Sequence, residues 1–217
     1  MKIPQIAPQA DVRASTRPAS TVRSRVRQWS TAALSLLLAP SLLLLSLDLR
    51  AAAPPMPSRL PQRIPDVHTT SFSGDLVDLP AMLQGKIAIL ILGFSKGSRN
   101  QATLWGRRLP TDYFYSPDVL YFEMPVLEAV PRLLRGAVLR SIKSEVSARS
   151  QPHFAPLTTD EQRWRTVVHY NQPDDAYVLV VDSNGLVQAQ FQGEPTDASY
   201  QEMKRRVEQL QSTSATK

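Results

Sequence analysis

One stretch, residues 86–105 with the sequence KIAILILGFSKGSRNQATLW, constrains the fold more than any other part of the chain. Residues 87–92 form an unbroken apolar run without a polar face, which is typical of a strand buried on both sides of a sheet. Gly93 and the polar turn Ser95-Lys96-Gly97-Ser98 follow, and a helical pattern begins near Gln101. A strand, a tight turn and a helix start in this order predict an α/β protein with its candidate chemistry at the turn.

The segments before and after this stretch predict the other parts of the sheet. Residues 72–79 indicate a short hairpin around Gly74, and residues 80–84 indicate one helical turn. Residues 119–124 predict a second strand that neighbours residues 87–92 through a right-handed crossover. Residues 177–181 and 186–191 predict a hairpin, because Asn184-Gly185 supplies a tight turn between them.

The helix boundaries are predicted from proline and capping residues. We expect the helix that begins near Gln101 to end by Pro110, since proline removes a backbone hydrogen bond. Thr158 and Glu161 have the spacing of a capping box, which predicts a helix start there. Ser199 and Glu202 predict the cap of a last helix, and residues from Ser212 onward indicate a disordered tail.

The N-terminal third of the chain has the pattern of an export or anchoring segment. Residues 1–28 are basic and polar, residues 29–47 are an apolar run, and residues 48–63 are a proline-rich linker. This order predicts a signal anchor, with a cleaved signal peptide and an organelle transit peptide as alternatives. Because the positive charge precedes the apolar run, we expect the following domain on the exported side, or secreted or periplasmic if the leader is cleaved.

Composition excludes several classes of function. The chain has no cysteine, which excludes disulfides, thiolate metal sites and thiol-based catalysis. His68, His153 and His169 lack the short spacings of a metal site, and no phosphate-binding loop of the type GxxxxGK[ST] is present. Residues 54–217 have a net charge of only +1, which argues against a nucleic-acid partner. We therefore expect no cofactor and no metal.

Ser95 and Ser98 are the candidate reactive residues of the turn. A serine hydroxyl becomes nucleophilic only beside a base, usually histidine, and no histidine lies near either serine in the sequence. The alternatives are that both serines cap the helix that follows, or that they contact a ligand or partner. The adjacent Asp174 and Asp175 are interpreted as solvated turn residues rather than as a catalytic pair.

Residues 126–149 predict a long amphipathic helix with a basic face. Arg132, Arg135, Arg140 and Lys143 occupy the positions between its apolar residues. One interpretation is a core helix with a solvated basic side. The other is a surface that binds anionic lipid headgroups or an acidic partner near a membrane.

Residues 64–210 resemble the thioredoxin-like superfamily. The similarity lies in the strand and turn at residues 86–105, in the lead-in at residues 64–86, and in the hairpin AYVLVVDSNGLV. The resemblance implies a thioredoxin-like three-layer sandwich with a mixed central sheet at residues 64–211, behind an N-terminal hydrophobic helix and before a tail at residues 212–217. It also implies that Ser95 and Ser98 stand at the positions of the family's C-x-x-C motif, and Ala176 at that of its cis-proline.

A narrower resemblance concerns the assembly factors of the mitochondrial F-type ATP synthase and their bacterial relatives. It is carried by MPVLEAVPRLLRGAVLRSIKSEV, GFSKGSRNQATLW and DDAYVLVVDSNGLVQAQFQGE. The resemblance implies a membrane-associated, non-enzymatic protein that binds a protein partner and acts as a chaperone on a membrane complex. The alternatives are a serine-dependent enzyme at Ser95 or Ser98 and a carrier of an apolar ligand.

Overall fold

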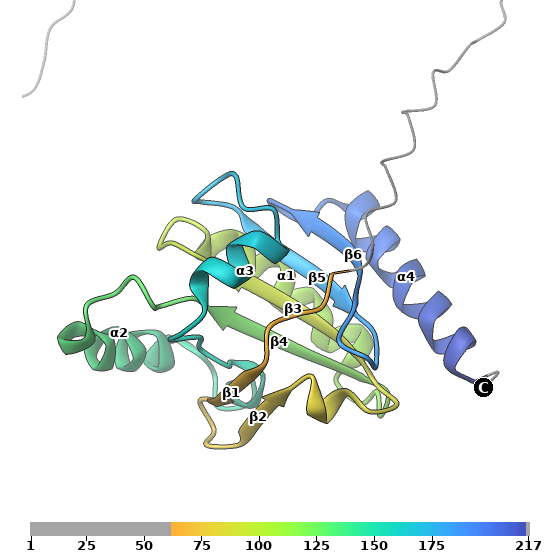
Figure 1. The fold of residues 1–217 in the computed structure, drawn as a ribbon, viewed down its shortest axis with the longest axis horizontal. Coiled ribbons are helices and arrows are strands. Elements are labelled where there is room, and N and C mark those ends of the chain that lie inside the picture. Colours follow the sequence, from red (N-terminus) through yellow and green to blue (C-terminus); the bar gives the residue numbers. More distant parts are fainter. Residues whose placement is uncertain (1–61, 216–217) are drawn as a thin grey trace, which may run out of the picture. The chain divides into compact units, whose positions relative to one another are not determined.

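Strand β3 (Ile87–Gly93) lies inside a four-stranded sheet, as its sequence predicts. The computed structural model describes residues 62–215. Strand β4 (Val119–Pro125) pairs with β3 in parallel, and β5 (Ala176–Val181) pairs with its other edge antiparallel. Strand β6 (Val187–Gln192) completes the order β4-β3-β5-β6 (Figure 1). The predicted neighbour of the central strand at residues 119–124 and the predicted hairpin at residues 177–181 and 186–191 are therefore confirmed.

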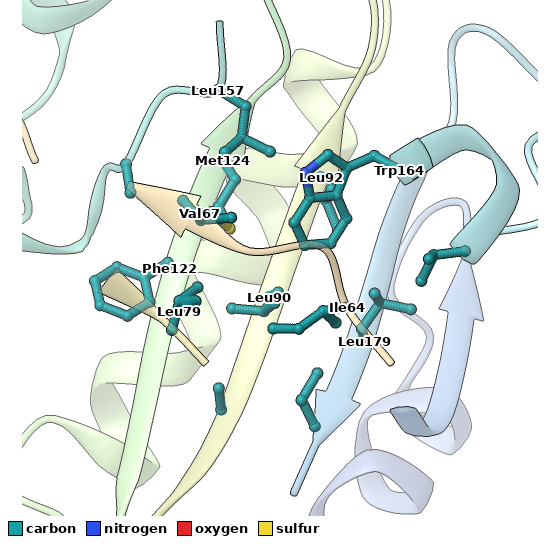
Figure 2. Packing of buried hydrophobic residues seen from close by; sticks show 14 of the residues in the cluster. Ile64, Val67, Leu79, Leu90, Leu92, Phe122, Met124, Leu157, Trp164 and Leu179 are labelled. Atoms are coloured by element: carbon teal, nitrogen blue, oxygen red, sulfur yellow. The ribbon is translucent and has the colours of Figure 1, made fainter. Parts of the chain in front are cut away.

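Two hydrophobic clusters cover the two faces of the sheet. Helices α1 (Arg99–Tyr113) and α4 (Asp197–Ala215) bury Trp105 and Met203 against one face. Helix α3 (Glu161–Val167) covers the other face together with a hairpin of β1 (Val67–Thr70) and β2 (Leu76–Leu79). The short 3₁₀ helix η1 (Ala81–Leu83) follows β2. Figure 2 shows Trp164, Leu79 and Leu90 in this second cluster. Each fully buried side chain of this size contributes about 1.5–3 kcal/mol.

Helix α1 does not end at Pro110, and this prediction is wrong. The helix includes Pro110 and continues to Tyr113. Leu109 and Tyr113 are buried against the sheet, and the Phe114 N–H donates to the Pro110 carbonyl oxygen at 3.3 Å. The apolar contacts of this last turn therefore outweigh the hydrogen bond that the proline removes.

Both predicted capping boxes differ from the observed helix starts. At α3, Asp160 precedes the helix in a left-handed conformation without a capping side chain, and the Glu161 N–H donates instead to the carboxylate of Glu128 at 2.6 Å. At α4, Ser199 and Thr196 exchange the capping hydrogen bonds, so the helix begins at Asp197 and not at Ser199. This helix also continues past Ser212, where the tail was predicted.

The predicted long helix at residues 126–149 is reduced to α2 (Arg132–Glu145). Its apolar start is extended chain, because the Val126 and Leu127 N–H groups donate to the carbonyl oxygens of Gly93 and Leu157. Pro131 precedes the first helical residue. No residue of α2 is buried, so the interpretation as a core helix is wrong. In Figure 1 this helix projects beside the sheet.

The predicted leader, apolar segment and most of the linker fall outside the described residues. Among residues 62–215, no helix has the length and apolar character needed to cross a membrane. A short 3₁₀ helix, η2 (Gln151–His153), completes the set of helices in this range.

Candidate functional site

The turn of residues 95–98, called the serine turn below, links the end of β3 to the start of α1. On the neighbouring strand, Ala176 lies directly opposite Gly93 in the antiparallel register. The structure therefore brings the three positions Ser95, Ser98 and Ala176 to one edge of the sheet.

Hydrogen bonds within the serine turn use both hydroxyl groups. The Ser95 hydroxyl accepts from the Ser98 N–H at 3.1 Å and donates to Asp174 Oδ1 at 2.7 Å. The Ser98 hydroxyl donates to the Ser95 carbonyl oxygen at 2.9 Å, and Ser98 is fully buried. The Ser95 hydroxyl thus closes the turn that precedes α1, because it bonds the N–H of Ser98, the residue before the helix. Neither serine side chain bonds an N–H group of the helix itself, so the capping prediction is not confirmed.

Two glycines allow the close packing of this turn. A Cβ atom at Gly97 would lie 2.2 Å from Asp174 Oδ1, and one at Gly93 would lie 2.8 Å from the Ser98 hydroxyl oxygen. Both separations are shorter than a van der Waals contact permits. The loop before β5 is therefore packed directly on the serine turn, and no larger residue fits between them.

Asp174 and Asp175 are not simply solvated turn residues, and this interpretation is wrong. Asp174 accepts from Ser95, and Asp175 accepts from the side-chain amide groups of Gln101 at 3.2 Å and Gln192 at 2.9 Å. The two carboxylates connect the loop before β5 to α1 and β6. Sequence reasoning discounted them because adjacent acids in a turn have many structural uses. The pairing of Gly93 with Ala176 in the assembled sheet is what places them beside the serine turn.

Gln101 is a further site residue that sequence reasoning missed. Its Oε1 atom accepts from the Ala176 N–H at 2.9 Å while its Nε2 atom donates to Asp175. A proline at position 176 would have no N–H to donate, so this hydrogen bond requires a residue other than proline there. The first turn of α1 is thereby attached to the start of β5.

The reactivity of the two hydroxyl groups in the serine turn is limited by their hydrogen-bond partners. In the described part of the chain, neither hydroxyl is bonded to a histidine or lysine that could act as its base. His68 lies on β1 beside Asp78, and the His153 ring stacks on Tyr121 with the ring centroids 3.8 Å apart. No cluster of residues that could bind a metal occurs within residues 62–215.

The four predicted surface cations on α2 do not have the same environment. Arg132, Arg140 and Lys143 are exposed, and none of them forms an ion pair among the described residues. Arg135 is half-buried and donates to the carbonyl oxygens of Glu128, Val130 and Thr158. It therefore holds α2 in place and is not part of a free surface.

A carboxyl group on the α1 side of the sheet is strongly perturbed. Glu123 lies on β4, and a Cβ atom at Gly106 of α1 would lie 1.9 Å from its Oε1 atom. Burial raises its pKa to about 8, and the charge of Arg107 opposes this only in part. At neutral pH most Glu123 side chains are therefore protonated.

Two hollows of the described domain lie away from α2. An open hollow of about 540 Å³ is lined mainly by polar residues of the β1–β2 hairpin region and the β5–β6 turn, including Arg63, Asp78 and Asn184. A second one of about 20 Å³ lies between β1 and the start of α3. Neither is lined by a residue of α2.

Comparison with solved structures shows which fold this arrangement belongs to. A protein of Chlorobium tepidum assigned as the thiol:disulfide interchange protein DsbE superposes with a TM-score of 0.50 over 70% of this chain and 96% of that one, at 14% identity. BsSco, of the Sco family of cytochrome c oxidase assembly proteins, gives 0.49 at 14% identity over 73% and 96%. The exposed lipoprotein thioredoxin of Streptococcus pneumoniae gives 0.47 at 12% identity over 65% and 98%. Neither a protein-family model nor a curated protein sequence matches the chain.

Proposed function

We propose that this protein, which has the thioredoxin-like fold, is a non-catalytic, membrane-associated domain that binds a protein partner during assembly of a membrane complex. The observation that carries the proposal is the serine turn. By the sequence resemblance, its hydroxyl groups stand where thioredoxin-like enzymes have their thiols. In the structure both hydroxyl groups are used in hydrogen bonds that hold the turn and the neighbouring loop together. The site is a structural junction, and the function lies in binding.

The membrane association is supported by the sequence before the domain. An apolar run at residues 29–47 follows a basic segment, which is the pattern of a signal anchor with the domain on the exported side. The proline-rich residues 48–63 then act as a spacer. If the leader is cleaved, the same domain is secreted or periplasmic.

The client is a membrane complex of the kind that assembly factors of the F-type ATP synthase serve. This part of the proposal rests on the sequence resemblance in residues 124–146, 93–105 and 174–194.

Deleting the gene for this protein in its native cell tests the proposal. Native gel electrophoresis of membranes from cells lacking the chain should show partly assembled complexes, and mass spectrometry should identify their subunits. The wild-type chain and Ser95→Ala should both restore assembly, because the hydroxyl has a structural role and no chemical one. Thermal unfolding of Ser95→Ala would verify that the variant is folded.

Two results would contradict the proposal. Unchanged membrane complexes in cells without the chain would remove the assembly role. A folded Ser95→Ala protein that fails to restore assembly, while still binding its partner, would favour the serine-dependent enzyme, with Asp174 as the group that activates Ser95.

A further inference from the structure

Helix α2 is the least covered element of the domain. None of its 14 residues is buried, and the Leu133 and Leu134 side chains are 97% and 56% exposed. Isolated helices of this length are marginal in water, because helices in proteins depend on packing of an apolar face. Leucines exposed at the start of such a helix therefore indicate a surface that is completed by another molecule.

The charge of α2 indicates an anionic partner. Arg132, Arg140 and Lys143 are spaced at eight and eleven residues, so they project from one side of the helix, called the basic face below. The acidic residue of α2, Glu145, is already paired with Arg99 at the start of α1. The first turn contains no acid to complement the positive end of the helix dipole. The cations of the basic face form no ion pair within the described domain.

The side of α2 that faces the domain is fixed by Arg135. Its guanidinium group donates to three backbone carbonyl oxygens, at distances of 2.5–3.4 Å. The half-buried residues on the same side of the helix are Val138, Leu139 and Ile142. This attachment turns Leu133 and the basic face outward, which gives a rigid surface that combines exposed leucines with cations.

We infer that α2 docks on an anionic lipid surface, with the basic face at the headgroup phosphates and Leu133 entering the boundary with the acyl chains. Interfacial helices combine these two features. A second copy of the chain fits less well, since two basic faces would repel each other. The inference rests on the proposed membrane association, and it adds a second contact between the domain and the bilayer.

The predicted linker is long enough for this contact. Residues 48–61 contain four prolines, and an extended proline-rich chain spans about 3.1 Å per residue. If it is extended as its composition predicts, this linker would span roughly 40 Å, which is comparable with the diameter of a domain of this size. An anchored domain can therefore bring α2 to the membrane surface.

A fluorescent label at Leu133 tests the inference on the full-length chain. The chain has no cysteine, so Leu133→Cys gives a single site for a polarity-sensitive dye. Leu76→Cys, at an exposed apolar position on the β1–β2 hairpin, is the matched control. Both labelled proteins are placed in nanodiscs of phosphatidylcholine alone, or of phosphatidylcholine with phosphatidylglycerol.

We expect a blue shift of the label at position 133 only in the anionic nanodiscs, and no shift at position 76. High salt should reverse the shift, because it screens the headgroup charge. Arg132→Gln/Arg140→Gln/Lys143→Gln should weaken docking about 100-fold, since each basic residue near an anionic surface contributes about fivefold. Arg163→Gln/Arg205→Gln/Arg206→Gln, which removes the same charge from α3 and α4, should leave the shift unchanged.

Four results would overturn the inference. The first is a label at position 133 that stays water-exposed in anionic nanodiscs. An equal shift in neutral nanodiscs would assign the surface to an uncharged apolar contact, a shift that needs a copurified protein would assign it to a protein partner, and a shift without lipid would assign it to another segment of the chain. Assembly of the membrane complex is also measured in cells that carry the Gln variant of the basic face. Normal assembly there leaves the proposed function in place even if lipid docking by α2 is refuted.

Discussion

Replacing Glu123 by glutamine should stabilise the domain, and the gain should grow with pH. The pKa of this carboxyl group is raised from 4.5 to about 8 by burial between β4 and α1. For an acid with a raised pKa in the folded state, the folded protein binds more protons than the unfolded chain between these two values. The contribution of protonated Glu123 to the free energy of unfolding is therefore fully present below pH 4.5, and it is lost as the pH rises toward 8.

The magnitude follows from the difference between the two pKa values. Each pKa unit corresponds to about 1.4 kcal/mol, so the ionised carboxyl lowers the free energy of unfolding by roughly 3 kcal/mol at pH 7 and about 5 kcal/mol above pH 8. Glutamine has almost the same shape and no charge to desolvate. We expect Glu123→Gln to match the wild type at pH 4 and to exceed it by about this amount at neutral and alkaline pH.

Urea unfolding of the full-length protein in non-ionic detergent micelles measures this difference. Trp105 and Trp164 are both fully buried, so their fluorescence reports unfolding. Glu194→Gln, at an exposed position, is the control for the loss of one negative charge. A difference between Glu123→Gln and the wild type that is constant from pH 4 to pH 8, or equal to that of the control, would refute the reasoning from burial.

Three other substitutions test the packing described above. Gly97→Ala should destabilise the domain by about 1–3 kcal/mol in the same unfolding assay, because its Cβ atom would overlap Asp174, and combining it with Asp174→Ala should recover part of the loss. Arg135→Ala should speed amide hydrogen exchange in α2 while Arg132→Ala does not, since only Arg135 holds the helix to the domain; equal exchange in both variants would contradict this. Trp164→Ala should lower the free energy of unfolding by about 3–5 kcal/mol, and a loss below 1 kcal/mol would contradict its role in the core.

The amino-acid pattern alone predicted the elements that depend on a local apolar period. Residues 87–92 have no polar face, and this composition suits only a strand covered on both sides, which is where β3 lies. The hairpin of β5 and β6 followed from Asn184-Gly185, because glycine readily takes the positive φ of 77° found at Gly185. The absence of cysteine excludes thiol chemistry by composition alone, whatever the fold.

The hydrogen bonds that define the site were decided by tertiary structure. Ser95 and Asp174 are 79 residues apart, and their contact depends on the register that places Ala176 opposite Gly93. The continuation of α1 through Pro110 depends on the burial of Leu109 and Tyr113 against the sheet. A sequence determines which residues favour burial or a turn within a few positions. Which distant polar groups then meet is set by the pairing of strands, because only the assembled sheet brings those groups within hydrogen-bonding distance.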